Sequence, residues 1–533
     1  MNRPALTIAC LMFAYARADE MSADDKLRVV YSHQFSLTRE GLPLTTIGIA
    51  EGRDRVEVAA SGGLRVLPDG DGGAEFRGGN HFVVRVEHAT PAKMNYHVVV
   101  ATHAPTDSVA IAADLERWRE RKFQPRSLEL GALFALRGRV IDNRKVAVSV
   151  LSAATAELAA ARARKVAEQY SLETSIEPEL VERPHGQVVA RGDSGAEIRN
   201  DSILWFAPAD AAATIEVKDV DKEGGGKETR RYFGEVYVTL DRHGKLAVVN
   251  AVPEDKLLAG LVPAEMNASA PLEALKAQAV AARNELLAKI GTRHQGDPYR
   301  LCSKQHCQVY AGAGHEDARA TAAVAATRGE LLLRDAGGLI DAVYFSSCGG
   351  HTENNEKVWG GTPDPSLRGH FDDELSDEVQ RPSLEGRLQE KQSASFCARP
   401  HGSENSFRWS VTLDLPAIAN RLGVGRLKSI EVLERGVSGR AVKLRLVGDS
   451  AQKEVAGELN IRKALGGLKS SLFLLTTARD ASGHFTLLRV DGAGHGHGVG
   501  MCQWGAIGMA GAGKKYDEIL RHYYLHSHLE KFY

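Results

Sequence analysis

The sequence predicts a multidomain α+β protein in which β-rich N-terminal units precede a mixed α+β domain. Its 533 residues exceed the usual size of a single domain, about 50 to 250 residues. Between residues 27 and 90, short alternating apolar and polar runs are separated by glycine-rich turns, a pattern typical of strands. From about residue 95 onward, strand-like runs alternate with helical stretches. Together these observations indicate several units that contain both kinds of element.

Composition places the chain among ordinary globular proteins. It is 43% hydrophobic and 25% charged, close to the average for soluble domains. The 67 Lys and Arg residues balance 68 Asp and Glu residues, so no long-range field would attract nucleic acid or an anionic membrane. The longest apolar stretch, about residues 5–14, is shorter than the roughly 20 residues of a spanning helix. We therefore expect no nucleic-acid partner and no membrane-spanning segment.

Residues 1–20 form a candidate export signal. Arg3 precedes the apolar stretch, and Ala14-Tyr-Ala16 follows it as a small-x-small cleavage site. Cleavage there would also remove Cys10. The alternative is a buried N-terminal strand. On the first interpretation the protein is periplasmic or otherwise exported to the cell envelope.

The N-terminal half divides into two predicted units. Residues 27–90 are expected to form a small β-rich unit, with strands such as Thr46–Ala50 and Arg55–Ala59. In residues 95–190 a strand followed by a helix occurs twice, with helices expected over 107–121 and 153–170. A polar, glycine-containing segment at 217–230 then marks a boundary. The remaining residues, about 200–533, are assigned to one mixed α+β domain.

Glu265 is the first candidate catalytic residue of this domain. It lies among Leu261, Val262, Ala264 and Met266, and such apolar surroundings raise the pKa of a carboxyl group, as a general acid requires at neutral pH. An ordinary surface glutamate is the alternative. The helix that follows, with Pro271 in its first turn, has one apolar stripe from Leu272 to Ile290. Gln278 and Arg283 are expected off that stripe or at its edge.

Two histidines and two cysteines lie within fourteen residues of one another and form a candidate zinc site. Two imidazoles and two thiolates complete a tetrahedral zinc site with no open position, so the expected role is structural. The competing interpretation is a disulfide between the two cysteines, with both histidines incidental. The four residues are His294, Cys302, His306 and Cys307.

Two glycine-rich loops have the composition of a sugar-binding pocket. Small hydroxyl and amide residues lie between Tyr344 and Trp359, and glycines surround the aromatic and amide residues of segment 494–506. Ordinary loops are the alternative for both. The candidate substrate-binding residues are Ser346, Ser347, His351, Thr352, Glu353, Asn354, His497, Gln503 and Trp504.

These motifs, in this order, resemble the stage II sporulation protein D family, which includes proteins described as amidase enhancers. The resemblance spans about residues 232–533. It rests on Asn250 to Met266, on Glu273-Ala-Leu-Lys-Ala-Gln-Ala-Val-Ala-Ala-Arg283, on the His/Cys cluster, on Ser346-Ser-Cys-Gly-Gly-His-Thr-Glu-Asn354 and on Gly496-His-Gly-Val-Gly-Met-Cys-Gln-Trp-Gly-Ala506. Residues 95–190 resemble, in layout alone, a sporulation-related repeat (SPOR) domain, which in its family binds peptidoglycan strands without stem peptides. A structural spacer is the alternative for that unit.

The resemblance implies a peptidoglycan lytic transglycosylase. In such an enzyme Glu265 would be the acid that cleaves the bond between N-acetylmuramic acid and N-acetylglucosamine in peptide-free glycan strands, which leaves 1,6-anhydromuramyl ends. A structural zinc ion would support the neighbouring region. The alternative is a wall-binding protein without enzymatic activity that recruits or enhances a cell-wall amidase.

The sequence departs from the family pattern at several positions. Asn267 replaces the usual proline after Glu-Met, Asn284 and Glu285 stand where Thr-Tyr is frequent, and Cys502 replaces a common serine. These changes put the substrate preference in doubt more than the acid. An exported protein could pair Cys348 with Cys397, but the pairing of Cys348, Cys397 and Cys502 cannot be deduced from sequence.

Overall fold

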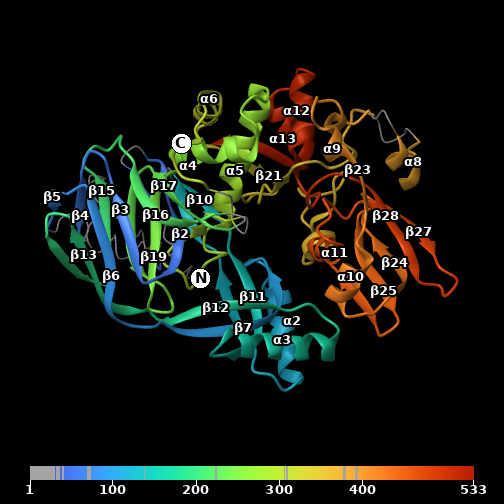
Figure 1. The fold of residues 1–533 in the computed structure, drawn as a ribbon, viewed down its shortest axis with the longest axis horizontal. Helices are drawn as coiled ribbons and strands as arrows, with labels where there is room; N and C mark the ends of the chain where they lie inside the picture. The colour runs from blue at the N-terminus through green and yellow to red at the C-terminus, as the bar shows by residue number, and fades with distance from the viewer. Residues whose placement is uncertain are drawn as a thin grey trace, which may run out of the picture.

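The computed structural model describes residues 30–31, 36–38, 41–68, 74–77, 79–136, 138–222, 225–304, 307, 310–375, 380–390 and 394–533. It contains many strands and helices in several sheets, which confirms the predicted multidomain α+β class (Figure 1). Within these residues, no helix is both long enough and apolar enough to cross a bilayer. The candidate signal segment and Cys10 lie outside the described residues.

Two facing sheets form the N-terminal part of the molecule. The first has the strand order β1(Ser36–Leu37), β2(Pro43–Arg53), β19(Leu246–Pro253), β18(Glu235–Leu240), β15(Ile203–Pro208), β4(Leu64–Leu67) and β5(Phe76–Arg77), with β20(Leu301–Cys302) parallel to β2. The second has the order β14(Glu197–Asp201), β13(His185–Gly192), β6(His81–Thr90), β3(Arg55–Ala59), β16(Ile215–Asp221) and β17(Lys227–Tyr232). Apolar side chains of both sheets, such as Phe82 and Phe206, belong to one core.

This pairing differs from the separate unit expected over residues 27–90. Strand β2 pairs with β19, about 200 residues later in the chain, and β4 pairs with β15. The strands expected over 46–50 and 55–59 do form, as parts of β2 and β3. Local alternation of apolar residues shows which residues are strands, but it carries no information on a partner so distant in sequence. Residues 27–90 therefore contribute strands to sheets that later segments complete.

The range 93–182 forms a four-stranded antiparallel sheet with two helices. In chain order these are β7(Lys93–His103), α2(Ser108–Glu120), β8(Arg126–Leu130), β11(Lys145–Ala153), α3(Ala156–Tyr170) and β12(Ser175–Glu182). Both helices form where they were expected, and Asp107 and Thr155 cap their first turns. Hairpin β9(Leu133–Leu136) and β10(Arg139–Asp142) interrupts the unit. We call residues 93–182 the βα unit.

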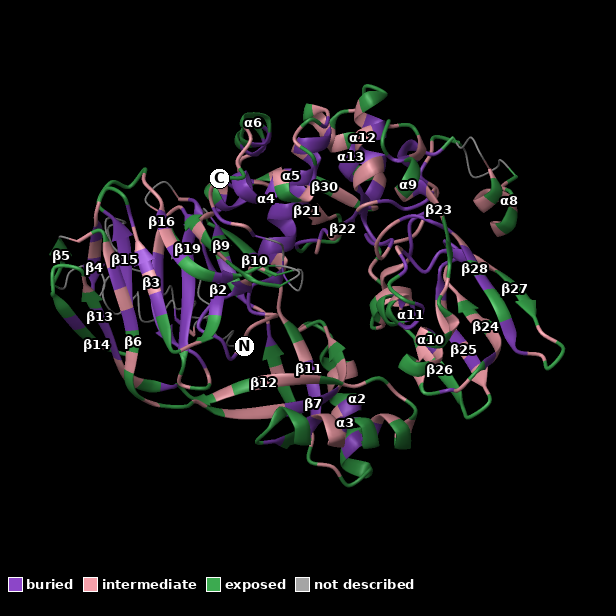
Figure 2. Cartoon of the chain, in the orientation of Figure 1, coloured by how far each residue is buried: buried purple, intermediate pink, exposed green. Residues whose placement is uncertain are grey.

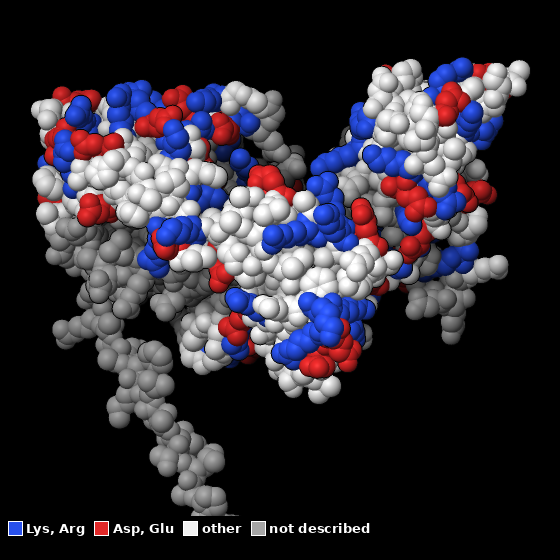
Figure 3. All heavy atoms as spheres, turned by 90° about the horizontal axis from the view of Figure 1, so that it is seen from below, with Lys and Arg blue, Asp and Glu red and all other residues white. Residues whose placement is uncertain are grey.

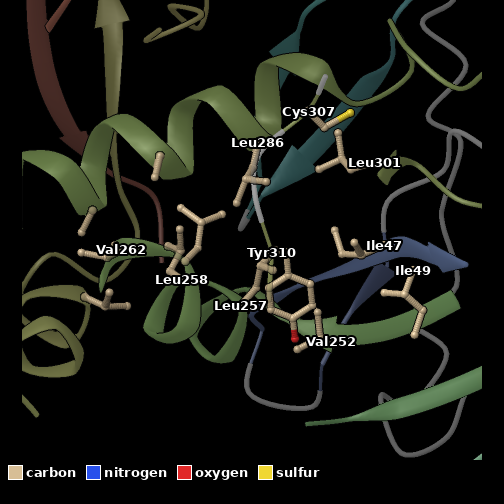
Figure 4. Close-up of a cluster of buried hydrophobic side chains, with 14 of the residues drawn as sticks. Ile47, Ile49, Val252, Leu257, Leu258, Val262, Leu286, Leu301, Cys307 and Tyr310 are labelled. Atoms are coloured by element: carbon tan, nitrogen blue, oxygen red, sulfur yellow. The ribbon is translucent and has the colours of Figure 1, made fainter. Parts of the chain in front are cut away.

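Helix α4(Glu254–Glu265) packs against β19 and β2 of the first sheet, and α5(Leu272–Lys289) and α6(Ala318–Ala326) pack against α4 and each other. Figure 4 shows Leu257, Leu258 and Val262 of α4 lying between α5 and the strands. Helix α5 corrects the expectation of a single apolar stripe, because Gln278 and Arg283 are fully buried whereas Leu272 is 41% exposed. The helix is covered on several sides by α4, α6, the C-terminal helices and a strand. Pro271 takes the N-cap position rather than the first turn.

The C-terminal part of the chain returns to these helices. Strands β22(Tyr344–Phe345) and β29(Met501–Cys502) pair in parallel, and β21(Glu330–Arg334) pairs with β30(Ser527–Lys531). Helices α12(Gln503–Gly511) and α13(Tyr516–Tyr523) contact α5. Segments far apart in sequence therefore meet at the C-terminal end of α4.

Between β22 and β29 the chain forms a lobe with a core of its own. This core contains residues such as Ile418, Leu444 and Phe473 (Figure 2). Its strands are β23(Arg408–Thr412), β24(Leu427–Arg435), β25(Ala441–Gly448), β26(Gln452–Ala456), β27(Phe473–Arg479) and β28(Phe485–Ala493), and its helices are α10(Leu415–Leu422) and α11(Glu458–Ala464). Short helices α7(Asn355–Trp359), α8(Leu384–Gln389), η1(Phe396–Ala398) and α9(Glu404–Phe407) connect the lobe to β22.

Candidate functional site

Glu265 is the last residue of α4, and its side chain is half-buried. Leu261 and Val262, in the preceding turn, are fully buried, whereas Ala264 is exposed. The helix ends here because Met266 adopts an extended backbone, and Asn267 then accepts the amide of Ser269 at 2.9 Å in an Asx turn. The carboxylate therefore lies at the edge of the core, with apolar groups on one side.

Gln503, the first residue of α12, connects the two predicted motifs. Its amide nitrogen donates to the carbonyl oxygen of Glu265 at 2.9 Å and to the Gln278 side-chain oxygen at 3.2 Å. The structure thus brings Gln503, predicted from sequence, next to the backbone of the predicted acid. Gln278 was not among the predicted site residues. A lone amide within the alanine-rich run of α5 was the signal that could have identified it.

Tyr344 also lies near Glu265 and was missed as a functional residue. Burial and the charges of Glu265 and Glu285 raise the pKa of Tyr344 well above its usual range. The phenol therefore stays protonated and can act only as a neutral hydrogen-bond donor or acceptor. The Tyr344 hydroxyl and the Gln278 amide nitrogen are both buried. The Gln278 side chain acts on the hydroxyl, and within the described residues neither atom has a further hydrogen-bond partner. This pair of polar groups near the carboxylate thus keeps capacity for a further hydrogen bond.

An aromatic stack lies next to these groups. The His497 ring is 4.9 Å from the ring of Trp359 and 5.1 Å from that of Phe345, measured between centroids. Trp359 is 51% exposed, so one of its faces can receive a ligand. An exposed aromatic face beside polar groups is typical of a sugar-binding surface.

The hydrogen bonds of His497 define its protonation state. Nδ1 accepts the Val499 amide at 3.1 Å, so Nε2 carries the proton and donates to the Tyr344 carbonyl oxygen at 3.0 Å. Burial is the main cause that lowers the pKa of His497 to about 3. His497 is therefore neutral near pH 7 and serves to connect two loops, not to transfer protons.

Ser346, Ser347 and Trp504 lie where these two loops meet. The Ser346 carbonyl oxygen accepts the Trp504 amide at 3.0 Å, and Ser347 forms a β-bridge with His495. The Ser347 hydroxyl is buried without a hydrogen-bond partner in the described part of the chain. The structure thus brings these residues together with Gln503.

His351, Thr352, Glu353 and Asn354 have partners within the protein instead. The Glu353 carboxylate accepts the backbone amides of Val437 and Ser438 at 3.0 and 3.2 Å and the Ser438 hydroxyl at 2.6 Å.

The other three side chains are held in a similar way. His351 packs against Phe371, Thr352 bonds to His370, and the Asn354 side chain accepts from Arg368 and Gly369. These side chains fix the loop and anchor the inserted lobe, and the predicted contact with substrate finds no support at these four positions.

Three of the four predicted zinc ligands converge. One ligand atom from each of His294, Cys302 and Cys307 lies within 4.8 Å of the others, and Nε2 of His294 is 3.3 Å from Sγ of Cys307. Nδ1 of His294 faces the Asp297 carboxylate at 2.8 Å, the arrangement that orients metal-binding imidazoles. The fourth predicted ligand, His306, lies outside the described residues. Two thiols and an oriented imidazole fit a zinc ion.

A buried ion pair joins this cluster to the region of Glu265. Lys289, at the end of α5, contacts the Glu285 carboxylate and donates to the Cys307 carbonyl oxygen at 2.7 Å. Glu285 is in turn one of the charges that act on Tyr344. Figure 4 shows Cys307 next to Leu301 and Leu286, at the edge of the core that supports α4. The cysteine loop is therefore connected, through Lys289 and Glu285, to the surroundings of Tyr344.

Comparisons with known proteins cover both halves of this region. A family model described as Stage II sporulation protein matches residues 242–333, and a model described as a domain of unknown function (DUF8618) matches residues 353–500. An uncharacterized protein of Brachyspira hyodysenteriae is 30% identical over 302 residues, which are 55% of this chain and 70% of that protein.

Two relatives from Bacillus subtilis carry descriptive names. The protein named Amidase enhancer is 29% identical over 297 residues, 50% of this chain but only 39% of its own length. The protein named Stage II sporulation protein D is 29% identical over 290 residues, 52% of this chain and 74% of its own. Together with the order of the motifs around Glu265, these matches show that the chain belongs to the stage II sporulation protein D family.

Proposed function

We propose that this protein is a lytic transglycosylase that cleaves peptide-free peptidoglycan strands with Glu265 as its catalytic acid. The observation that carries the proposal is the half-buried Glu265 carboxylate, close to the buried Tyr344 hydroxyl and Gln278 amide nitrogen, which have no partner other than each other among the described residues. The names of the relatives support a role at the cell wall.

The chemistry needs one carboxyl group. Glu265 donates its proton to the oxygen between N-acetylmuramic acid and N-acetylglucosamine, and the C1–O bond breaks. The carboxylate so formed then takes the proton from the muramyl C6 hydroxyl, whose oxygen attacks C1. A 1,6-anhydro ring closes, no water is consumed, and Glu265 regains its proton.

Two other carboxylates of the region are already engaged by the protein. Glu285 is paired with Lys289, and the Glu353 carboxylate accepts three hydrogen bonds from the inserted lobe. A hydrolase normally uses a second carboxylate to position water or to form a covalent intermediate. The engagement of these two groups favours the single-carboxylate lyase mechanism.

The test is the product of digestion by a Glu265→Gln variant. Glutamine keeps the size and polarity of the side chain but has no proton to donate, so we expect cleavage of peptide-free glycan to be lost while the fold is retained. Glu120→Gln, on the exposed end of α2, is the matched control and should retain full activity. Full activity of Glu265→Gln in a chromatographic assay would refute the proposal.

The similarity to a protein named Amidase enhancer favours a second function, a wall-binding protein that stimulates an amidase. Under this alternative the purified protein forms no glycan product alone, but it accelerates a purified amidase. Glu265→Gln would leave that stimulation unchanged. The two functions are thus separated by one variant in two assays.

For the cysteine loop we propose a structural zinc ion held by His294, Cys302, His306 and Cys307. The zinc ion would fix the conformation of the loop after α5. The hydrogen bond from Lys289 to the Cys307 carbonyl oxygen would connect that loop to α5. Metal analysis of the wild type and of a Cys302→Ser variant should differ by about one equivalent. A Cys302–Cys307 disulfide found by peptide mass mapping, with no difference in zinc, would instead establish the competing interpretation. Chelation should lower stability first and activity as a consequence.

The βα unit is proposed to hold glycan while the site at Glu265 cleaves it. Its strands β8 and β12 border a cavity of about 500 Å³, whose lining includes His97, Ser127, Glu177 and Gln295. Cavities of about 300–1,000 Å³ are the usual size for ligands. A side chain added at Gly360, next to Trp359, would collide with Glu173 of this unit, so the two parts are in contact. Since the substrate is wall glycan, the proposed location is the cell envelope.

A further inference from the structure

Three cysteines and an aspartate converge at a second place, separate from the cluster at His294. Sγ of Cys348, Cys397 and Cys502 and a carboxylate oxygen of Asp372 all lie within 4.8 Å of one another. Each of the four residues is fully buried. In a tetrahedral site with zinc–sulfur bonds of about 2.3 Å, ligand atoms lie roughly 3.8 Å apart. The group therefore has the composition and the dimensions of a zinc site.

Two of the three sulfur atoms accept hydrogen bonds from backbone amides. Sγ of Cys502 accepts the amides of Cys348 and Gly505 at 3.1 and 3.3 Å, and Sγ of Cys348 accepts the amide of Gly350 at 3.3 Å. Such N–H···S bonds stabilise negative charge on sulfur. Backbone donors thus contact the sulfur atoms of Cys348 and Cys502 in a place that water does not reach.

The fourth group is a buried carboxylate held in a fixed orientation. One oxygen of Asp372 accepts the Tyr523 hydroxyl at 2.6 Å, and the other accepts the Cys397 amide at 2.9 Å. A fully buried carboxylate is costly unless cations or strong donors compensate it. Each oxygen keeps a lone pair for a further partner.

Two arginines, the buried Arg440 and the half-buried Arg408, supply nearby positive charge. Arg440 donates to the Cys348 carbonyl oxygen at 3.0 Å, and Arg408 donates to that of Gly349 at 2.9 Å. A divalent ion with three thiolates and a carboxylate has a net charge of −2. The two guanidinium groups offset that charge without occupying a ligand position.

We propose that Cys348, Asp372, Cys397 and Cys502 bind a second structural zinc ion. Binding releases the three thiol protons to solvent, and all four positions are filled by the protein, so no site for water remains. The inference goes beyond the proposed function and does not depend on it. Cys348 follows Ser347 and Cys502 precedes Gln503. This zinc ion would therefore fix the two loops of the candidate site relative to each other.

A disulfide between Cys348 and Cys397 is the competing arrangement. Their sulfur atoms are 3.4 Å apart, and all five described cysteines are thiols in the structure. A bond between these two would leave the Cys502 thiol buried beside the Asp372 carboxylate, and among the described residues only the His522 imidazole, 3.9 Å from that carboxylate, is a possible cation beside it. Zinc uses all four groups, which is the reason to prefer it.

The test measures zinc in the full-length protein and in two variants, all purified in reducing, chelator-free buffer. In Cys502→Ser, the serine hydroxyl can still accept the Gly505 amide at the start of α12, so the fold should survive. Cys397→Ser removes a different ligand and serves as the independent variant. Each is expected to contain about one equivalent of zinc less than the wild type. Because the readout is a difference, it does not depend on whether the site at His294 is occupied.

Cobalt(II) provides a second readout. The difference spectrum between cobalt-loaded wild type and Cys502→Ser should show thiolate-to-cobalt charge-transfer bands. Equal zinc contents in all three proteins, with no such difference spectrum, would overturn the proposal. A Cys348–Cys397 disulfide in protein purified without reductant, found by peptide mass mapping together with equal zinc contents, would overturn it in favour of the competing arrangement.

Discussion

The hydroxyl of Tyr344 is buried near Glu265, and within the described residues only the Gln278 side chain interacts with it as a hydrogen-bond partner. If it binds substrate, Tyr344→Phe should lower kcat roughly tenfold to a hundredfold, the effect of losing one hydrogen bond in a site that excludes water. The midpoint of thermal unfolding should change little, because the only interaction that the change removes from the free protein is the one with Gln278. Tyr170→Phe, in α3, is the control and should leave kcat unchanged. Wild-type kcat in Tyr344→Phe would show that the hydroxyl has no part in catalysis.

The buried imidazole of His497 predicts how the stability of the protein depends on pH. Its pKa is about 3 in the folded protein, against an ordinary value of 6.5. The unfolded chain therefore binds the proton first as the pH falls, so the contribution to stability is present above about pH 6.5 and is lost as the pH falls toward 3.

Denaturant titrations at several pH values provide the measurement. His497→Gln keeps one acceptor and one donor but cannot be protonated, so its free energy of unfolding should fall less steeply than that of the wild type between pH 6.5 and 4. Identical slopes would contradict the assignment of a neutral, buried imidazole.

At the level of single residues, the sequence identified groups more readily than their roles. Glu265 and Gln503 could be predicted because each lies in a distinctive motif, and the structure brings them together. The polar neighbours of Glu353 in sequence suggested that it binds a ligand. Its carboxylate instead accepts hydrogen bonds from residues 437 and 438 of the inserted lobe. Contacts made across about 85 residues leave no local signal.

Among the elements, α4 and α5 are joined by a buried ion pair. Nε of Arg283 donates to Glu254 at 2.5 Å, both side chains are at most 3% exposed, and the Tyr533 hydroxyl also donates to this carboxylate. Arg283→Met should lower the free energy of unfolding by about 3–5 kcal/mol, because it leaves a buried charge without its partner.

The double variant Glu254→Met/Arg283→Met separates this cause from a loss of packing. It removes both charges, so it should be more stable than Arg283→Met alone in urea denaturation. A double variant that loses the sum of the two single effects would mean that the two residues act independently.

Helix α5 and strand β2 show where hydrophobic periodicity in the sequence fails to predict the packing of an element. The apolar run of α5 predicted a helix correctly, but its buried polar residues Gln278 and Arg283 were expected at an edge. Periodicity assumes one face toward the core, whereas α5 is packed on several sides. Likewise, the sequence showed that β2 is a strand, but it did not show that β2 pairs with β19.

On the scale of the whole molecule, the surface favours recognition by shape and polar contacts over long-range attraction. Figure 3 shows basic and acidic side chains interspersed on one face, with a hollow between the lobe of the N-terminal sheets and the lobe of β24–β28. The chain as a whole has a formal net charge of −1. With charges so balanced, a glycan would be held by contacts at the site and not by a long-range field.

The cavity of the βα unit leads to a test of glycan binding by the full-length protein. Ser127 is exposed on β8 and lines the cavity, so Ser127→Trp should fill part of it without disturbing the core. We expect pull-down by peptide-free sacculi to fall severalfold. Thr477→Trp, exposed on β27, is the control and should bind normally. Equal binding by both variants would leave the βα unit as a spacer, with the assignment of Glu265 unaffected.

The central claim is that Glu265 drives cleavage without water, and one experiment tests it directly. Peptide-free glycan strands are digested in water enriched in oxygen-18, and the new ends are analysed by mass spectrometry. The lyase mechanism predicts 1,6-anhydromuramyl ends that contain no oxygen-18, formed by the wild type and by Glu120→Gln but not by Glu265→Gln. Reducing ends labelled with oxygen-18, or anhydro ends formed equally well by Glu265→Gln, would contradict it.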